Sequence, residues 1–244
     1  MPAEPLVEMA ALAGLDYLVI DCEHGPDDLV ALQHHLVGAQ AYGIDVLVRV
    51  GEDEPGLVLR SLDLGASGVV VPRVEDVEDA RRAVAHAHYP PLGERGFATY
   101  GRAGRYGTVE AAEHLRRAAE STLVVVMIET AEGCDNARGI LSVDGVDAVL
   151  VGPADLAVSL GLPEAGAVDR AVAAVHAEAG RAGRTVLSIV GDTAGAERAR
   201  STGATVLYNL TAVLRKTLEE AAAVGSSNPG GVQDTGGRAP DRTL

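Results

Sequence analysis

Several residue types are scarce in this sequence of 244 residues. It has no Trp and one Phe, so Ala, Val and Leu must fill its core. Its two cysteines, Cys22 and Cys134, cannot form a disulfide framework. No apolar run reaches the roughly 18 residues of a membrane span, and the first five residues lack the basic and apolar regions of a secretory signal. These absences predict a globular cytoplasmic protein that does not associate with membranes.

Lysine is the scarcest charged residue. Lys216 is the one lysine among 20 basic residues, and it lies in a late, charged helical segment. A Schiff-base mechanism needs a desolvated lysine in the site, so lysine-imine chemistry is nearly excluded. The formal net charge of −15 opposes non-specific binding of nucleic acid or anionic membranes. An anionic substrate would therefore need specific local arginines.

Short apolar runs alternate with helical segments along the chain. Such runs fit strands buried on both faces, as in a parallel sheet. The predicted strands are residues 16–21, 45–50, 68–74, 123–130, 148–152, 185–190 and 205–209. The predicted helices between them are residues 26–42, 55–64, 77–88, 109–119, 168–182 and 194–202. Glycines at 14, 43, 65, 145, 183 and 203 are placed to end a helix before the next strand.

This alternation predicts an α/β fold with right-handed crossovers. We interpret it as a TIM-type (β/α)8 barrel lacking its first β-strand, because seven strands are recognisable and the chain starts in a helical segment, residues 5–13. The alternatives are an open sheet, a barrel completed by another element, or the loss of about 20–25 residues, one β/α unit. No phosphate-binding glycine motif supports an open doubly wound sheet.

The predicted domain is residues 1–224, and it ends in an amphipathic helix, residues 211–224. That helix could cap the barrel or dock onto another subunit. Residues 225–244 are rich in Gly, Pro, Ser and Asp and have little to bury, which predicts a disordered tail.

Polar residues gather where the predicted strands end, at the face that carries chemistry in a barrel. They are Asp21, Glu23, His24, Arg49, Arg73, Glu129 and Asp155, with Ser188, Asp192 and Asn209 further along. Charged groups in apolar runs are costly to bury unless they are paired or coordinated. This clustering is the main functional signal in the sequence.

Two of these carboxylates are candidate metal ligands. Glu129 follows six apolar residues and needs a cation, which could be a metal ion or the guanidinium of Arg49 or Arg73. Asp155 follows a Gly-Pro turn and could either ligate a metal or cap a helix starting near Leu156. Two carboxylates without neighbouring Cys or His favour a hard divalent cation such as Mg²⁺ or Mn²⁺ over Zn²⁺.

His24 is a candidate base, because it lies three residues after Asp21, which could orient its ring or tune its charge. The other six histidines fall in helical or loop stretches and are predicted to be surface residues: His34, His35, His86, His88, His114 and His176. Cys22 is predicted to pack in the core. Arg102, Arg105 and Tyr106 occupy a Gly-rich stretch that could be a lid, a subunit contact or plain solvated surface.

A set of motifs in order resembles the HpcH/HpaI aldolase/citrate lyase family, and within it the metal-dependent 4-hydroxy-2-oxo acid (2-keto-3-deoxy acid) aldolases. The motifs are Asp-Cys-Glu-His-Gly from residue 21, VLVRV from 46, LGASGVVVPRV from 64, YPPLGERG from 89, MIETAEG from 127 and VGPADLA from 151. The likeness runs from about Leu6 to Leu160 and more loosely to Val224. The ordered set is specific, although each motif alone is weak.

The resemblance implies a role for each matching residue. Glu129 and Asp155 would bind a divalent metal, Mg²⁺ or Mn²⁺ foremost and Co²⁺ or Zn²⁺ as alternatives, with Glu23 acting through water. His24 and Asp21 would form the catalytic base, and Arg49 would hold the 2-oxo acid and its developing enolate. Backbone amides around Gly152, Pro153, Ala154 and Asp155 would receive the pyruvate carboxylate.

The implied function is that of a class II aldolase, which cleaves or forms 4-hydroxy-2-oxo acids and gives pyruvate and an aldehyde. The resemblance also implies a homo-oligomer, a trimer or hexamer, that assembles through the C-terminal helix. Another carbon–carbon lyase or decarboxylating enzyme of the superfamily, or a truncated metal-binding pseudoenzyme, remains an alternative. Arg73 stands where this aldolase branch often has an uncharged residue, so the acceptor specificity can differ. A first strand preceding Met1 is also expected from the resemblance.

Overall fold

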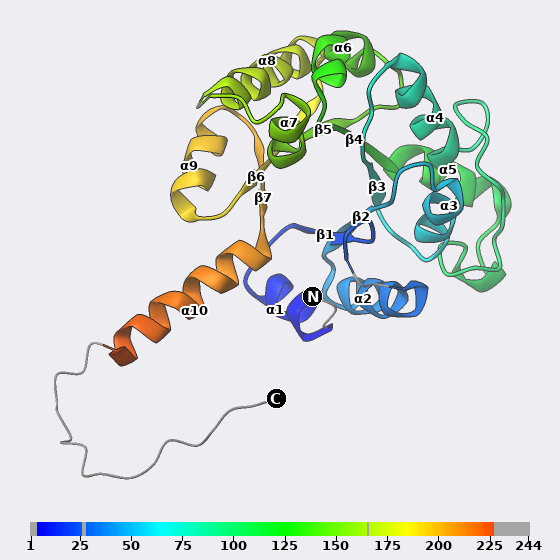
Figure 1. Cartoon of the computed structure of the whole chain (residues 1–244). Coiled ribbons are helices and arrows are strands. Elements are labelled where there is room, and N and C mark those ends of the chain that lie inside the picture. The colour runs from blue at the N-terminus through cyan, green and yellow to red at the C-terminus, as the bar shows by residue number, and fades with distance from the viewer. Residues whose placement is uncertain (1–3, 26–27, 165, 227–244) are drawn as a thin grey trace, which may run out of the picture.

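The computed structural model describes residues 4–25, 28–164 and 166–226. Seven parallel strands pair in chain order, and helices lie outside the curled sheet (Figure 1). The strands are β1 (Tyr17–Asp21), β2 (Asp45–Arg49), β3 (Gly68–Val71), β4 (Leu123–Ile128), β5 (Ala148–Val151), β6 (Thr185–Val190) and β7 (Thr205–Tyr208). All seven strand predictions are confirmed, and β2 to β5 and β7 end one to three residues earlier than predicted.

The helices follow the predicted alternation. They are α1 (Glu4–Leu12), α2 (Leu29–Tyr42), α3 (Pro55–Asp63), α4 (Val77–Ala87), α5 (Ala111–Ser121), α6 (Ala131–Leu141), α7 (Pro153–Ser159), α8 (Ala167–Ala182), α9 (Thr193–Ser201) and α10 (Leu210–Ser226). A short 3-10 helix spans Arg105–Gly107. The six glycines predicted to end helices all have positive φ, between 67° and 99°, which L side chains rarely adopt.

The strand order decides between the two predicted architectures. A doubly wound sheet reverses its strand order at a switch point, whereas this sheet runs β1 to β7 without reversal. The sheet is therefore singly wound and curled, as in a TIM-type barrel, and the doubly wound alternative is wrong. The absence of a first barrel strand stays a prediction.

Two apolar layers hold the sheet in place. One lies between the strands and the outer helices, and Val48, Val69, Val126 and Val149 supply the strand side of it. The other fills the concave face and includes Met127 and Leu150. Because successive side chains of a strand point to opposite faces, each β-branched run serves both layers. This explains why the runs are continuously apolar.

Three histidines and the end of the last helix differ from the sequence predictions. His35, His88 and His114 are 4–6% exposed, so the prediction that they are surface residues is wrong. His114 Nε2, for example, hydrogen-bonds the Tyr89 hydroxyl at 3.1 Å. The C-terminal helix α10 extends to Ser226, two residues into the predicted tail, and residues 227–244 lie outside the described residues. Cys22 packs against the core as predicted.

The Tyr17 side chain links the two ends of the sheet. Its hydroxyl donates a hydrogen bond of 2.9 Å to the carbonyl of Val206, so β1 reaches β7 across 189 residues of sequence. Burial, with a contribution from Asp16, raises the pKa of Tyr17 to about 12. The neutral phenol is therefore the form that the folded protein favours.

This contact predicts a loss of stability in alkali. Because the pKa of Tyr17 is higher in the folded than in the unfolded state, its neutral phenol contributes its full stabilisation below pH 10. This stabilisation is lost as the pH rises toward 12. Two pKa units correspond to about 2.7 kcal/mol for a fully buried group, and partial solvent access reduces this to about 1–2 kcal/mol. Urea unfolding at pH 8 and pH 11.5 measures the free energy of unfolding of the parent and of Tyr17→Phe. The variant should be less stable than the parent at pH 8, and its stability should fall less between pH 8 and pH 11.5. An equal fall in both proteins would show that Tyr17 is not the group responsible.

Candidate active site

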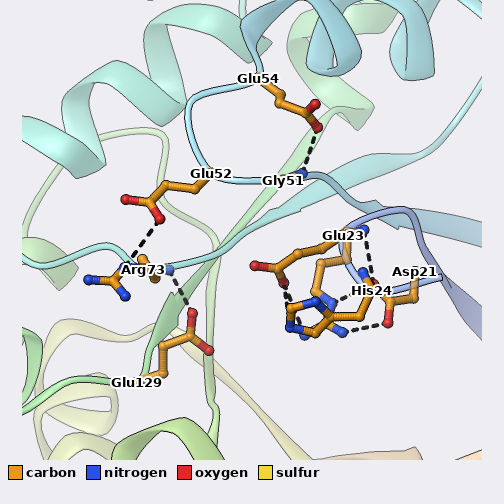
Figure 2. A network of polar contacts seen from close by, with 9 residues as sticks. Asp21, Glu23, His24, Gly51, Glu52, Glu54, Arg73 and Glu129 are labelled. Carbon is orange, nitrogen blue, oxygen red and sulfur yellow. Dashed lines mark hydrogen bonds and ion pairs between the residues drawn. The ribbon is translucent and has the colours of Figure 1, made fainter. Parts of the chain in front are cut away.

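The carboxyl ends of neighbouring parallel strands lie along one edge of the sheet, and five of them supply the candidate site. Asp21 is the last residue of β1, and Arg49 is the last residue of β2. Arg73 follows β3, Glu129 directly follows β4, and Asp155 lies in the first turn of α7, after β5. Figure 2 labels three of these residues, Asp21, Arg73 and Glu129, and shows Glu23 and His24 beside Asp21.

Arg49 is the cation around which the β1 side of the site is built. Its Nε and Nη2 bind both oxygens of Asp21, at 2.8 and 2.5 Å, and its Nη1 lies 3.2 Å from Glu23 Oε2. Burial opposes ionisation of Asp21, but the Arg49 hydrogen bonds and the amides of His24 and Glu23 outweigh it and lower the Asp21 pKa. The ion pairs likewise outweigh burial and raise the pKa of Arg49.

Asp21 shapes the loop that carries Glu23 and His24. Its Oδ1 accepts the backbone N–H of Glu23 at 3.1 Å and of His24 at 3.2 Å. Gly25 completes this turn, because a Cβ there would lie 2.0 Å from the Asp21 carbonyl oxygen. The sequence predicts that Asp21 acts on the His24 ring. The structure shows instead contacts to the His24 backbone, while the ring, 67% exposed, has its Nε2 3.9 Å from Glu23 Oε2.

Glu129 is a buried carboxylate, 4% exposed. Its Oε1 accepts the backbone N–H of Arg73 at 2.9 Å. The Arg73 guanidinium pairs with Glu52 and Glu75, at 3.3 and 3.5 Å. Glu129 therefore meets Arg73 through the main chain, and the alternative of a salt bridge to that guanidinium is wrong.

The charges around Glu129 favour an additional cation. Burial raises its pKa, and the negative charges of Asp155 and Glu23 raise it further, against the Arg73 hydrogen bond and the charge of Arg49. Burial also raises the pKa of Glu23, with Asp21 and Asp155 adding to it and Arg49 opposing. Three carboxylates thus act on one another at this edge of the sheet.

Asp155 does not cap a helix. Helix α7 starts at Pro153, and its N-cap is Gly152, which makes no side-chain cap. Asp155 is exposed in the first turn, so the N-cap alternative is wrong. Gly152 has a separate role, since a Cβ there would lie 2.6 Å from Glu129 Oε2. Glycine lets the β5–α7 turn approach this carboxylate.

Asp192 and Asn209, two of the polar residues beyond β5, make contacts that serve the fold. Asp192 caps α9 by accepting the Gly195 N–H and lies 3.6 Å from Lys216. Asn209 accepts the Ala212 N–H at the start of α10. These contacts account for two side chains that sequence position alone places with the site.

The site residues offer oxygen ligands to a metal. In the described part of the chain, no group of three or more His, Cys, Asp or Glu side chains is arranged to hold an ion. Glu129 and Asp155 are two carboxylates, and Mg²⁺ is commonly bound by one or two carboxylates with waters and substrate completing its shell. Burial, with the negative charges of Asp155 and Glu23, raises the pKa of Glu129, so a nearby cation would stabilise its ionised form. The residues present therefore fit a divalent cation.

No helix in the described ranges is long and apolar enough to cross a membrane. Helix α10 projects away from the sheet and its other helices (Figure 1). Its Leu210 and Leu218 side chains are 46% and 69% exposed.

Comparison with known proteins is consistent with this arrangement. A 2-keto-3-deoxy-L-rhamnonate aldolase from Salmonella gallinarum is 38% identical over 160 residues, which are 65% of this chain and 59% of that relative. The match thus spans less than two thirds of the relative's length.

Solved structures match over nearly the whole chain. An HpcH/HpaI aldolase from Desulfitobacterium hafniense is 31% identical with a TM-score of 0.88, over 94% of this chain and 91% of that one. A family protein from Burkholderia cenocepacia is 34% identical with a TM-score of 0.86, over 93% and 92%. The family model described as HpcH/HpaI aldolase/citrate lyase matches residues 3–209. The chain therefore belongs to the HpcH/HpaI aldolase/citrate lyase family.

Proposed function

We propose that the protein is a divalent-metal-dependent aldolase that cleaves or forms 4-hydroxy-2-oxo acids, giving pyruvate and an aldehyde. The observation that carries the proposal is the buried carboxylate of Glu129. Its pKa is raised by burial and by the negative charges of Asp155 and Glu23. Family membership and the name of the Salmonella relative support the reaction class.

Glu129 and Asp155 would hold the cation, Mg²⁺ or Mn²⁺ by their oxygen chemistry, with Glu23 contributing through water. When bound, the metal supplies Lewis acidity toward the carboxylate and keto oxygens of the 2-oxo acid. The first turn of α7 leaves backbone N–H groups without intrahelical partners. Those of Ala154 and Asp155 would receive the substrate carboxylate beside Gly152 and Pro153.

Arg49 would stabilise the negative charge that develops on the keto oxygen. A guanidinium has five N–H donors, and three contacts of Arg49 go to Asp21 and Glu23. Two N–H groups are left for the substrate. Because the ion pairs fix the guanidinium before substrate arrives, its alignment costs little during the reaction.

His24 would move the proton of the 4-hydroxyl group. In the cleavage direction its ring accepts that proton, the C3–C4 bond breaks, and the C4 carbon leaves as an aldehyde. The electron pair of that bond passes into the enolate of pyruvate, and protonation at C3 then gives pyruvate. The exposed ring suits access to the solvent side of the site. Asp21 would hold the loop in place through the His24 and Glu23 amides.

The direct test is cleavage of a 2-keto-3-deoxy acid by the full chain, with pyruvate measured by a lactate dehydrogenase assay. Pyruvate release with Mg²⁺ or Mn²⁺, its loss on chelation and its return on adding metal are the expected results. Release that survives chelation would exclude the metal-dependent mechanism. A folded protein that binds Mn²⁺ yet releases no pyruvate from a panel of such acids would favour the pseudoenzyme alternative. Other carbon–carbon lyase activities would be tested on the same preparation.

We also propose that the protein forms a homo-oligomer through α10. This helix carries exposed leucines and lies apart from the sheet, and apolar side chains of this kind are typical of subunit contacts. Light scattering of the full chain gives its mass, and a monomeric mass at micromolar concentration would contradict the proposal.

A further inference from the structure

Arg73 lies in a short bulge at the end of β3. Val71 pairs with Val126 of β4, and the Val74 N–H returns to the carbonyl of the next β4 residue, Met127, at 3.0 Å. In an unbroken parallel ladder the Arg73 N–H would bond that carbonyl, so the β3 side of the ladder carries one extra residue. Bulges of this kind redirect groups next to functional sites.

The backbone of Arg73 is left-handed, with φ of 49°. This region is disfavoured for residues with a Cβ and is adopted mainly by Gly, Asn and Asp. In that conformation the Arg73 N–H points out of the β3–β4 ladder and donates to Glu129 Oε1 at 2.9 Å. Strained backbone persists where the surrounding structure enforces it, and such residues gather at active sites.

The Arg73 side chain points away from the Glu129 carboxylate (Figure 2). It pairs with Glu52 on the loop after β2 and with Glu75 two residues further on. These contacts tie down the bulge at a half-exposed position. The main chain of Arg73 serves Glu129, and its side chain holds the bulge.

We propose that Arg73 is a positioning residue whose left-handed backbone orients Glu129 for the divalent cation. The proposal rests on the proposed function, in which Glu129 is a metal ligand. The Arg73 N–H fixes Oε1, and Oε2 lies against Gly152, where a Cβ would come within 2.6 Å. The carboxylate is thereby held from both sides. Partners that orient a metal ligand typically change metal affinity by about 10–100-fold when they are lost.

The test uses substitutions that separate backbone conformation from side-chain charge. Arg73→Gly and Arg73→Asn remove the guanidinium but tolerate positive φ, whereas Arg73→Val opposes it. Mn²⁺ affinity of the full chain is measured by electron paramagnetic resonance, without substrate. We expect Arg73→Gly and Arg73→Asn to bind within about threefold of the parent and Arg73→Val to bind about 10-fold more weakly or worse.

Arg105 provides a matched control. It is also an arginine with φ of 49°, and it is exposed in the 3-10 segment. Arg105→Val introduces the same strain without a contact to Glu129, so Mn²⁺ affinity should not change. Thermal unfolding of both valine variants shows whether a loss of affinity reflects general destabilisation. If Arg73→Val does not fold, Arg73→Ala replaces it, with a smaller loss expected.

Parent-like Mn²⁺ affinity in Arg73→Val would overturn the proposal. Equal losses of Mn²⁺ affinity in the Gly, Asn and Val variants would also overturn it, because they would assign the role to the side-chain charge. Weak binding by the Val variant alone supports it. Glu129→Gln is measured in the same series. Parent-like Mn²⁺ binding by that variant would contradict the proposed metal site itself, so the two failures are distinguishable.

Discussion

Glu129→Gln is expected to lose Mn²⁺ binding and to lower aldol cleavage by about 100-fold or more, the scale on which even outer-shell ligand partners act. Glutamine keeps the volume and can accept the Arg73 N–H, so the bulge can stay in place. What it removes is the negative charge that a cation needs. Cleavage of a 2-keto-3-deoxy acid and Mn²⁺ titration are the two measurements.

The same substitution should not destabilise the metal-free protein. The pKa of Glu129 is higher in the folded than in the unfolded protein, so folding favours its neutral form. As the pH rises through the pKa range of this carboxyl, that contribution to stability is lost, and ionised Glu129 opposes folding at neutral pH. Glu129→Gln should therefore unfold at the same temperature as the parent or higher. Glu132→Gln, the same chemical change at an exposed position three residues away, is the control for both assays. Retained cleavage in Glu129→Gln would refute the role of Glu129.

Arg49→Lys is expected to lower kcat/KM by about 10²–10³-fold, the usual effect of removing a fixed donor to a developing oxyanion. Lysine keeps the positive charge but has no planar fork, so it cannot bind both oxygens of Asp21 and reach Glu23 as Arg49 does. The remaining charge should preserve some binding of the 2-oxo acid, and the larger loss should be in kcat.

Arg49→Lys should also be less stable than the parent, because Asp21 loses its two hydrogen bonds from Arg49 and Glu23 loses its ion pair with that guanidinium. Arg117→Lys is the matched control, since Arg117 makes an exposed ion pair with Glu113 on α5. That pair should contribute little to stability. Steady-state kinetics and thermal unfolding of the two variants give the comparison. If kcat/KM of Arg49→Lys stays within threefold of the parent value, the geometry of the Arg49 guanidinium is dispensable.

The charged residues at the strand ends were predictable because they are recognisable from local sequence. A carboxylate directly after six apolar residues, as at Glu129, is an unusual place for a charge. Parallel pairing then brings the ends of neighbouring strands to one edge of the sheet. The same reasoning places Asp21 and Arg49. Their ion pair was not derivable, because it depends on the register that sets Asp21 opposite Arg49.

Other features depend on packing that no local pattern encodes. His114 is buried because Tyr89 and Phe97 pack against it and the Tyr89 hydroxyl bonds its ring. Tyr17 reaches a strand 189 residues away. Arg73 adopts a left-handed backbone without glycine or asparagine to signal it. The start of α7 was misplaced although Pro at the first helical position is a known signal.

The exchange of pyruvate methyl protons with deuterated water is the sharpest test of a metal-dependent reaction at Glu129, because it needs only the metal, the 2-oxo acid and the residues around Glu129. It requires no knowledge of the aldehyde. We expect deuterium incorporation that depends on Mg²⁺ or Mn²⁺, stops on chelation, and is lost in Glu129→Gln but kept in Glu132→Gln. Exchange that persists after chelation, or an active Glu129→Gln variant, would contradict it.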